Sequence, residues 1–409
     1  MNNEIIITFS LYGIGGAQRR AFALANRFAD KGYTVYVVAV WGRDSTIGSE
    51  NYYGVSEKIN LVIVPEYYDS KKNDKKTVQI DKYIERKIFV LKKLQLICQG
   101  NKKLLNKINY SINGYKKSKD LRPFFVEHPN ATVISFGFNI FDKVFFAVKG
   151  LQNRLIYAET NASDKYVSER YYNNIKQSIK KSSACVFQTK EEQKDHDMQG
   201  CTNSYVIHNP VKADLPEPYS GERKKVIVNF CRMTRQKNLL LLIQAFEKFL
   251  RVFPDYKLEI YADTAAENIR GYKDELIKYI TDNDLSESVY ILPASSKIHD
   301  IIRNYAMFVS SSDYEGISNS MVEAMAIGLP CVCTDCAGGG AREMITDGEN
   351  GLLTPVGDVD KLSEAMIRMI SEEGLAEKCE NNAAKIRETH SVEKIAEQWL
   401  DVVDFVFKK

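Results

Sequence analysis

The 409-residue chain has no uncharged apolar run of about 18 residues, so we expect no transmembrane helix. Its first residues lack the basic start and long apolar core of a secretory signal peptide. Internal repeats and low-complexity stretches are also absent, and a net charge of +3 gives the whole chain no basis for binding nucleic acid. These absences favour a cytoplasmic globular protein, and its length suits two domains.

Metal-binding patterns are missing as well. Eight cysteines are scattered, and three of them lie close together at Cys331, Cys333 and Cys336. No second Cys or His pair with ligand spacing accompanies them, so a buried strand explains them better than a metal site does. No Asp-x-Asp motif occurs in a suitable place. We therefore expect neither a metal nor a cofactor, and a reducing compartment.

The order of apolar runs indicates an α/β protein. A strand at Glu4–Ser10, a glycine-bearing loop, a helix at Gln18–Ala29 and a strand at Tyr33–Val40 make a βαβ unit of a parallel sheet. The pattern continues and then restarts near residue 225, with further strands expected at Asn60–Val64, Thr132–Phe136, Arg154–Glu159, Ala184–Thr189, Lys225–Cys231, Lys257–Ala262, Val289–Leu292, Met307–Ser310 and Pro330–Thr334.

Two alternating runs predict two doubly wound, Rossmann-like domains. We place the N-terminal domain at residues 1–210, the C-terminal domain at 211–390, and a last helix at 391–409 that packs on one of them. Turn-rich residues at Glu217–Gly221 are the expected linker.

One segment of the N-terminal domain differs in charge. Residues 70–122 hold 16 Lys/Arg against 4 Asp/Glu, a local charge of +12, which leaves −9 for the rest of the chain. Apolar residues recur within it at helical spacing. Two interpretations stay open: a solvated helical insertion, or a basic amphipathic surface for anionic lipid or a phosphate-bearing acceptor. The second makes the protein peripheral at the cytoplasmic membrane face.

The most specific motif runs from Asp313 to Pro330 and contains two glutamates, Glu315 and Glu323. A capping box, Ser320-x-x-Glu323, explains the second glutamate alone. It leaves Glu315 unexplained. A loop carboxylate followed by the free amides of a helix N-terminus suits a sugar diphosphate, because amides attract phosphates and carboxylates accept hydrogen bonds from sugar hydroxyls.

This motif resembles that of glycosyltransferase family 4, whose members carry a glutamate-x7-glutamate motif. The resemblance implies a GT-B fold, two Rossmann-like domains facing a central cleft, and a retaining reaction. It also implies that Glu315 contacts the donor sugar and Glu323 the nucleotide ribose. The remaining donor contacts implied by the motif are those of Gly316, Ile317, Ser318 and Asn319.

A second element is similar to the same family. The expected strand from Val226 ends in a loop with Arg232 and Lys237, which the resemblance places on the donor diphosphate. Two cations after a strand are suited to neutralising a departing diphosphate, and a merely solvated basic loop is the other interpretation. Cys231 stands where the family usually has glycine.

The glycine loops give weaker signals. Gly15 and Gly16 resemble the family's N-terminal loop, although Gln18 replaces its acidic residue. Such a turn lets the backbone approach phosphate or sugar closely. Gly338–Gly340 either shapes the donor pocket or only turns the chain. The family's N-domain histidine has no counterpart here, and Asn139 or residues 159–161 are candidates for its positioning role.

Together these features predict a hexosyltransferase that moves a sugar from a nucleotide-diphosphate donor, UDP-linked by expectation, to a hydroxyl. The expected acceptor is a lipid-linked oligosaccharide or a surface-polysaccharide precursor. A wall polymer of polyol phosphate is the alternative acceptor, and a GT-B epimerase or phosphorylase is the alternative enzyme class. Arg232, Lys237 and the helix-terminal amides would do the work of a divalent ion.

Overall fold

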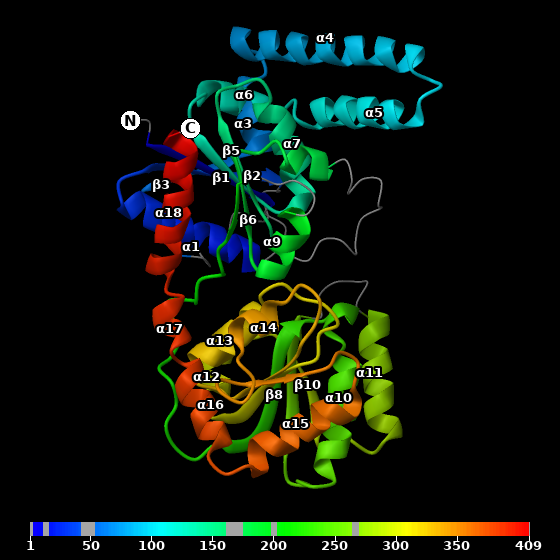
Figure 1. The fold of residues 1–409 in the computed structure, drawn as a ribbon, viewed down its shortest axis with the longest axis vertical. Helices are drawn as coiled ribbons and strands as arrows, with labels where there is room; N and C mark the ends of the chain where they lie inside the picture. Colours follow the sequence, from blue (N-terminus) through cyan, green and yellow to red (C-terminus); the bar gives the residue numbers. More distant parts are fainter. Residues whose placement is uncertain are drawn as a thin grey trace. The chain divides into compact units, whose positions relative to one another are not determined.

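A computed structural model describes residues 3–10, 16–41, 54–160, 175–197, 203–263 and 270–408. The chain folds into two compact units (Figure 1). Unit 1 comprises residues 1–187, 193–207 and 392–409, and unit 2 comprises residues 188–192 and 208–391. The segment Glu217–Gly221, expected as a linker, lies inside unit 2.

Unit 1 is built on a parallel sheet of seven strands in the order β3-β2-β1-β4-β5-β6-β7. β-branched and aromatic residues dominate these strands, which is typical of strands buried on both faces. Their bounds are β1 Glu4–Ser10, β2 Thr34–Trp41, β3 Ile59–Ile63, β4 Thr132–Phe136, β5 Arg154–Ala158, β6 Ala184–Phe187 and β7 Ser204–Val206.

Two helix layers cover this sheet. On one face α1 (Gly16–Asp30) packs beside the C-terminal helix α18 (Val392–Lys408). Trp399 of α18 is 1% exposed and lies against Phe136 of β4, so burial of this residue holds the last helix on unit 1. The other face is covered by α6 (Arg122–Glu127) and α7 (Phe138–Val148).

Unit 2 repeats the pattern with six parallel strands in the order β10-β9-β8-β11-β12-β13. In both sheets the strand order reverses beside the first strand of the unit, so β8 has β9 on one side and β11 on the other. Their bounds are β8 Lys224–Arg232, β9 Lys257–Asp263, β10 Val289–Pro293, β11 Tyr305–Ser310, β12 Cys331–Thr334 and β13 Leu352–Thr354.

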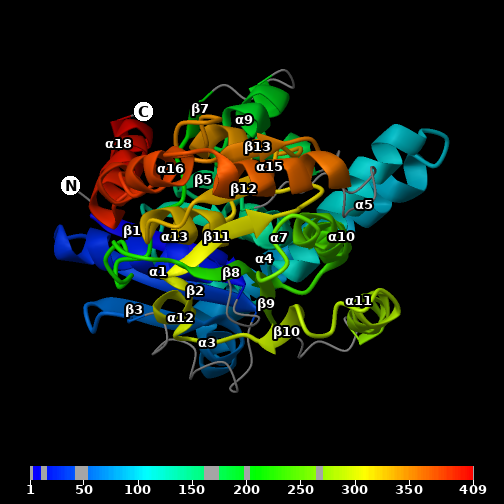
Figure 2. The same ribbon diagram turned by 90° about the horizontal axis from the view of Figure 1, so that it is seen from below.

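The helices of unit 2 also lie on both faces of its sheet (Figure 2). One face carries α10 Leu239–Leu250, α11 Arg270–Asp282, α15 Val359–Ser371 and α16 Leu375–Ala383. The other carries α12 Ile298–Ile302, α13 Asn319–Ala326, α14 Gly340–Met344 and α17 Ile386–Thr389. Each unit is thus a three-layer, doubly wound α/β domain, as the sequence predicts.

The basic segment is helical. It forms α3 (Val64–Lys71), α4 (Lys75–Ile97) and α5 (Lys102–Lys117). α4 and α5 pack together as a hairpin that extends away from the rest of unit 1 in both views (Figures 1 and 2). The side chain of Asn101 caps α5 by accepting a hydrogen bond from the amide of Leu104.

Two short strands, β7 and β13, are absent from the sequence-based prediction because three residues carry too little periodicity to detect. The interpretation of the cysteine group as structural is supported. Cys331 and Cys333 belong to buried strand β12, and burial raises the pKa of Cys336 to about 12. Among the residues that the structure describes, no helix combines the length and hydropathy needed to cross a membrane.

Candidate functional site

The candidate site lies at the carboxyl ends of β8 and β11. These strands pair in parallel, with Val228 opposite Phe308, at the point where the strand order of unit 2 reverses. Open α/β sheets bind ligands at such a switch point, because loops leaving neighbouring strands diverge there. Arg232 is the last residue of β8, Lys237 lies in the loop that follows, and the loop after β11 carries Glu315.

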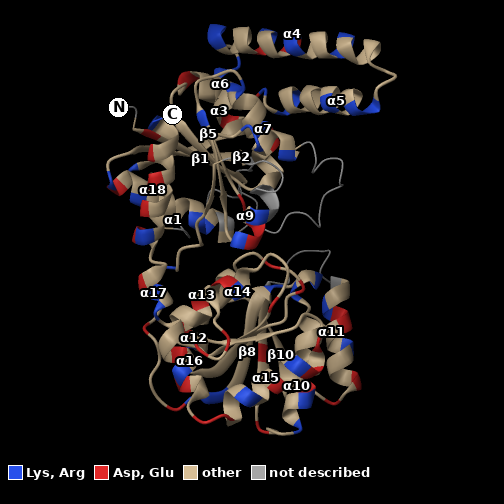
Figure 3. Cartoon of the chain, in the orientation of Figure 1, with Lys and Arg blue, Asp and Glu red and all other residues tan. Residues whose placement is uncertain are grey.

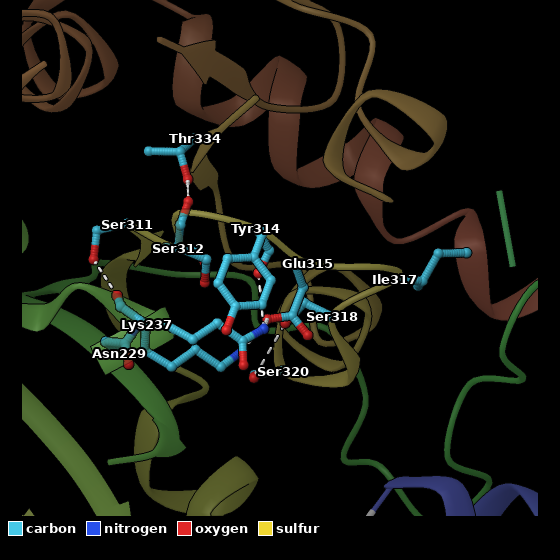
Figure 4. A network of polar contacts seen from close by, with 12 residues as sticks. Asn229, Lys237, Ser311, Ser312, Tyr314, Glu315, Ile317, Ser318, Ser320 and Thr334 are labelled. Atoms are coloured by element: carbon cyan, nitrogen blue, oxygen red, sulfur yellow. Dashed lines mark hydrogen bonds and ion pairs between the residues drawn. The ribbon is translucent and has the colours of Figure 1, made fainter. Parts of the chain in front are cut away.

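Lys237 and Glu315 form an ion pair across these two loops (Figure 4). The ammonium group of Lys237 donates to Oε2 of Glu315, and the two side chains are only 9% and 14% exposed. Gln236 donates from Nε2 to the carbonyl of Tyr314 at 2.8 Å and to the same carboxylate oxygen at 3.3 Å. The carboxylate is therefore fixed in place by two donors from the β8 loop.

Backbone contacts hold the loops together beneath this pair. Ser311 Oγ donates to the carbonyl of Lys237 at 2.9 Å. Asn238 has φ of 42°, caps α10 through the amide of Leu241, and donates to Asp313 Oδ1 at 2.8 Å. A left-handed Asn is tolerated because its short polar side chain bonds locally. The ion pair thus sits on a rigid base.

Arg232 is the last residue of β8 and is exposed. It makes no ion pair with any other residue that the structure describes. Its position places a second positive charge on the strand that leads to Lys237.

Glu323 lies deeper, in α13, and is 5% exposed. Its Oε2 is 2.7 Å from Nε2 of His299 in α12, which is itself 7% exposed and packs edge-on against Phe230. The capping-box interpretation is wrong. Ser318, not Ser320, is the N-cap of α13, and Glu323 falls in the second turn, too far along to reach the N-cap amide.

The loop from Gly316 to Asn319 is held by two buried side chains that the motif does not contain. The amide of Ile317 donates to Oε1 of Gln188 at 3.2 Å. Asn209 donates to the Ile317 carbonyl at 3.4 Å and to Asn319 Oδ1 at 3.3 Å. The amide of Ile317 is therefore engaged by the protein. Sequence reasoning missed both residues, because they lie more than 100 positions upstream.

The triple-glycine loop touches the glutamate loop directly. The amide of Glu315 donates to the Ala337 carbonyl at 3.0 Å. A Cβ at Gly340 would lie 1.7 Å from the carbonyl oxygen of Gly316, so only glycine fits there. Glu191 contributes an acceptor at 3.2 Å to the amide of Gly338. Gly338–Gly340 therefore shapes the backbone around Glu315 and does more than turn the chain.

Among the residues that the structure describes, the N-terminal candidates form no comparable cluster. Gly15 lies outside the described residues, and Gly16 begins α1. Gln18 donates to the Ser10 carbonyl at 2.7 Å, so it fastens the strand end. Asn139 is exposed.

Residues 159–161 were the other candidates for the histidine's positioning role. Asn161 lies outside the described residues. Glu159 is 3% exposed and accepts a hydrogen bond of 2.5 Å from the hydroxyl of Tyr157. Arg20, also buried, donates to the carbonyl of Glu159 at 2.9 Å. Glu159 is therefore part of a buried polar network at the carboxyl end of β5.

Comparison with known proteins agrees with this geometry. Residues 212–386, which contain the whole cluster of Arg232, Lys237, Glu315 and Glu323, match the family glycosyl transferases group 1. This part of the chain is thus similar to the domain of that family. Over the whole chain, the structure of S. aureus TarM in complex with fondaparinux, alpha-GlcNAc-glycerol and UDP is similar, with a TM-score of 0.74 and 17% identity, covering 98% of this chain and 99% of TarM. The fold of the two units is therefore GT-B.

Two curated proteins are similar in sequence. A poly(glycerol-phosphate) alpha-glucosyltransferase of Bacillus subtilis is 26% identical over 90% of this chain and 56% of its own length. A Campylobacter jejuni N-acetylgalactosamine-N,N'-diacetylbacillosaminyl-diphospho-undecaprenol 4-alpha-N-acetylgalactosaminyltransferase is 32% identical over 40% of this chain and 42% of its own length. The chain thus spans about half the length of these relatives.

Proposed function

We propose that this chain is a nucleotide-sugar-dependent glycosyltransferase whose donor binds at the carboxyl ends of β8 and β11. The observation that carries the proposal is the nearly buried ion pair of Lys237 and Glu315 at the topological switch point. The pair joins the loop after β8, whose Lys237 supplies a cation for a phosphate group, to the loop after β11, whose Glu315 supplies a carboxylate for sugar hydroxyls. Ion pairs are common on exposed surfaces, whereas this one is nearly buried at the switch point of the sheet, where open α/β sheets bind their ligands.

The reaction that fits this site breaks the bond between the anomeric carbon of the sugar and the diphosphate oxygen. A hydroxyl oxygen of the acceptor forms the new bond to that carbon. The proton of the hydroxyl passes to the leaving diphosphate, and the products are a glycoside and the nucleoside diphosphate. We propose that the anomeric configuration is retained, because a leaving phosphate that takes the proton directs the acceptor to its own face of the sugar.

Lys237 has the main electrostatic role. Its ammonium group has three donors, so it can hold Glu315 and still contact a phosphate oxygen. Negative charge grows on the diphosphate as the bond breaks, and a fixed cation in a site that excludes water stabilises that charge. Arg232 adds a second cation at the end of the strand. These residues supply the charge that a divalent ion would otherwise provide.

Glu315 and Glu323 bind different parts of the donor. Glu315, fixed by Lys237 and Gln236, accepts hydrogen bonds from hydroxyls of the transferred sugar. Glu323, fixed by His299, accepts them from the ribose. A uridine diphosphate donor is supported by the UDP bound in the TarM structure.

For the acceptor we propose a polyol-phosphate wall polymer. The Bacillus relative, named for poly(glycerol-phosphate), aligns over 90% of this chain. The sequence-based expectation put a lipid-linked glycan first, and it is now the second candidate. The Campylobacter relative, whose similarity covers 40% of this chain, supports the lipid-linked glycan.

The test is a matrix of donors and acceptors with the purified chain. UDP-glucose, UDP-N-acetylglucosamine and UDP-N-acetylgalactosamine are each incubated with poly(glycerol phosphate), poly(ribitol phosphate) or an undecaprenyl-diphosphate sugar. UDP release and product mass are measured. We expect one donor to glycosylate a polyol-phosphate polymer, and Glu315→Gln to abolish that turnover.

Several results would contradict the proposal. A product on the lipid-linked acceptor alone would select the second acceptor. Release of free epimerised sugar, or phosphorolysis without an acceptor, would place the chain in another GT-B class. Equal turnover by Glu315→Gln would refute the site.

A further inference from the structure

The hairpin of α4 and α5 carries the highest positive charge density of the chain. From Arg86 to Lys119 there are ten Lys/Arg residues and no Asp or Glu. Figure 3 shows these basic residues on both helices of the hairpin. None of the groups in the candidate donor site belongs to this segment, so the proposed transfer reaction leaves its charge unexplained.

The distal half of α4 also exposes large apolar side chains. The inner face of the helix packs through Ile80 and Ile84, which are 9% and 1% exposed. The outer and lateral faces expose further apolar residues toward the tip, namely Phe89 (57%), Val90 (49%), Leu94 (42%), Leu96 (69%) and Ile97 (79%). Clustered exposed residues of this size mark an interaction surface, because single exposed ones are scattered in ordinary proteins.

Cations are interspersed with these apolar groups. Lys93 lies over the ring of Phe89, with its Nζ 4.6 Å from the ring centroid. Lys92 is exposed beside it, and Lys102 and Lys103 begin α5 at the tip. An exposed helix face that combines bulky apolar residues with lysines has the composition of helices that lie in the interface of a bilayer.

We propose that this hairpin docks the protein on an anionic phospholipid surface. Phe89, Leu96 and Ile97 would enter the boundary between headgroups and acyl chains. The flanking lysines would be attracted to the negative headgroups.

Two other occupants fit less well. A polyol-phosphate polymer would pair with the lysines, but its chain has no apolar part to cover Leu96 and Ile97. A second copy of the hairpin would cover the apolar residues. It would also bring the lysines and arginines of one hairpin against those of the other, and this repulsion between like charges opposes association. A bilayer with anionic headgroups above an apolar interior matches both the positive charge and the exposed apolar side chains of the hairpin.

Ion pairs at its base join the hairpin to unit 1, so docking would hold the whole unit. Gln95 of α4 donates to Asn109 of α5 at 2.7 Å. At the base, Lys143 of α7 is 1% exposed and pairs with Asp120 at 2.9 Å, while Lys117 pairs with Asp142 at 2.9 Å. Removing one partner of such a buried pair is costly, so the base resists bending.

The test is flotation of the full chain with vesicles of phosphatidylglycerol and phosphatidylcholine in varied ratio. We expect binding at least about tenfold tighter to vesicles rich in phosphatidylglycerol, and weakened by salt. Leu96→Ser with Ile97→Ser should weaken binding about tenfold or more. Lys92→Glu with Lys93→Glu should reduce the preference for anionic lipid. These positions are exposed, so folding is unaffected.

The matched control makes the same kinds of substitution on α11 of unit 2. It combines Ile277→Ser, at a residue that is 44% exposed, with Lys278→Glu. This variant should bind vesicles as the unaltered chain does. Equal binding to neutral and anionic vesicles would overturn the proposal. So would hairpin variants that change only the oligomeric state, or only binding to poly(glycerol phosphate). Flotation uses no sugar donor, so its failure is distinct from failure of the proposed function.

Discussion

Nε2 of His299 lies 2.7 Å from Oε2 of Glu323, and both side chains are almost completely buried. The pair links α12 to α13 on one face of the unit 2 sheet. A buried carboxylate needs such a partner, because desolvation of an unpaired charge is costly. His299 is thus a positioning residue for the glutamate that we assign to the ribose.

Replacing His299 with Phe should weaken donor binding. The aromatic ring fills the same space, but Glu323 loses the hydrogen bond with His299, and a hydrogen bond to a charged group is worth about 1.5–3 kcal/mol. We expect the KM for the sugar nucleotide to rise about tenfold or more with little change in kcat, because the ribose is remote from the reacting bond. His299→Gln, which keeps an N–H donor, should recover part of the affinity. His128→Gln in unit 1 is the control.

Lys237→Met should act on the chemical step instead. Loss of the cation that opposes the developing diphosphate charge is expected to lower kcat by about 10²–10³-fold. Lys225→Met, an exposed lysine on the same strand β8, should leave kcat unchanged. Steady-state UDP release measures both. An equal loss in the two variants would mean that folding, not the site, is affected, and circular dichroism would show it.

Gly340→Ala should disrupt the site through the backbone. The added methyl group would lie 1.7 Å from the carbonyl oxygen of Gly316, and the neighbouring atoms are backbone atoms that cannot rotate away. The loop bearing Glu315 must move, so we expect at least a tenfold loss of kcat/KM. Gly271→Ala meets nothing within 4 Å and serves as the control. Unchanged activity in the Gly340 variant would show that the loop tolerates displacement.

Local patterns in the sequence were sufficient to predict the two doubly wound units. The family resemblance placed Lys237 and Glu315 in one donor site, but their ion pair depends on the neighbouring positions of β8 and β11 in the sheet, which the sequence pattern does not give. The sequence could not reveal His299 as the partner of Glu323, because a histidine on a five-residue helix has no periodicity that identifies its neighbour.

Gln188 and Asn209 were missed for a different reason. They approach the loop at Ile317 from segments more than 100 residues upstream, and long-range contacts of single polar residues leave no pattern in one sequence.

The stacked histidines His208 and His390 predict a pH dependence of stability. Nδ1 of His208 lies 2.9 Å from Nε2 of His390, where the chain enters and leaves unit 2. Burial, with the nearby His208 as a smaller cause, lowers the pKa of His390 to about 4, whereas the unfolded value is about 6.5. Glu343 and Thr389 also face the pair.

Below pH 6.5, His390 therefore binds a proton in the unfolded chain but stays neutral in the folded protein until the pH approaches 4. Its contribution to stability is present above pH 6.5 and is lost as the pH falls towards 4. Because the ring is partly exposed, we expect a loss of about 1 kcal/mol in the free energy of unfolding between pH 7 and pH 5. Urea unfolding at both pH values measures it. His390→Gln cannot titrate, so the difference between the two pH values should shrink by that amount, and an unchanged difference would assign the effect to other groups.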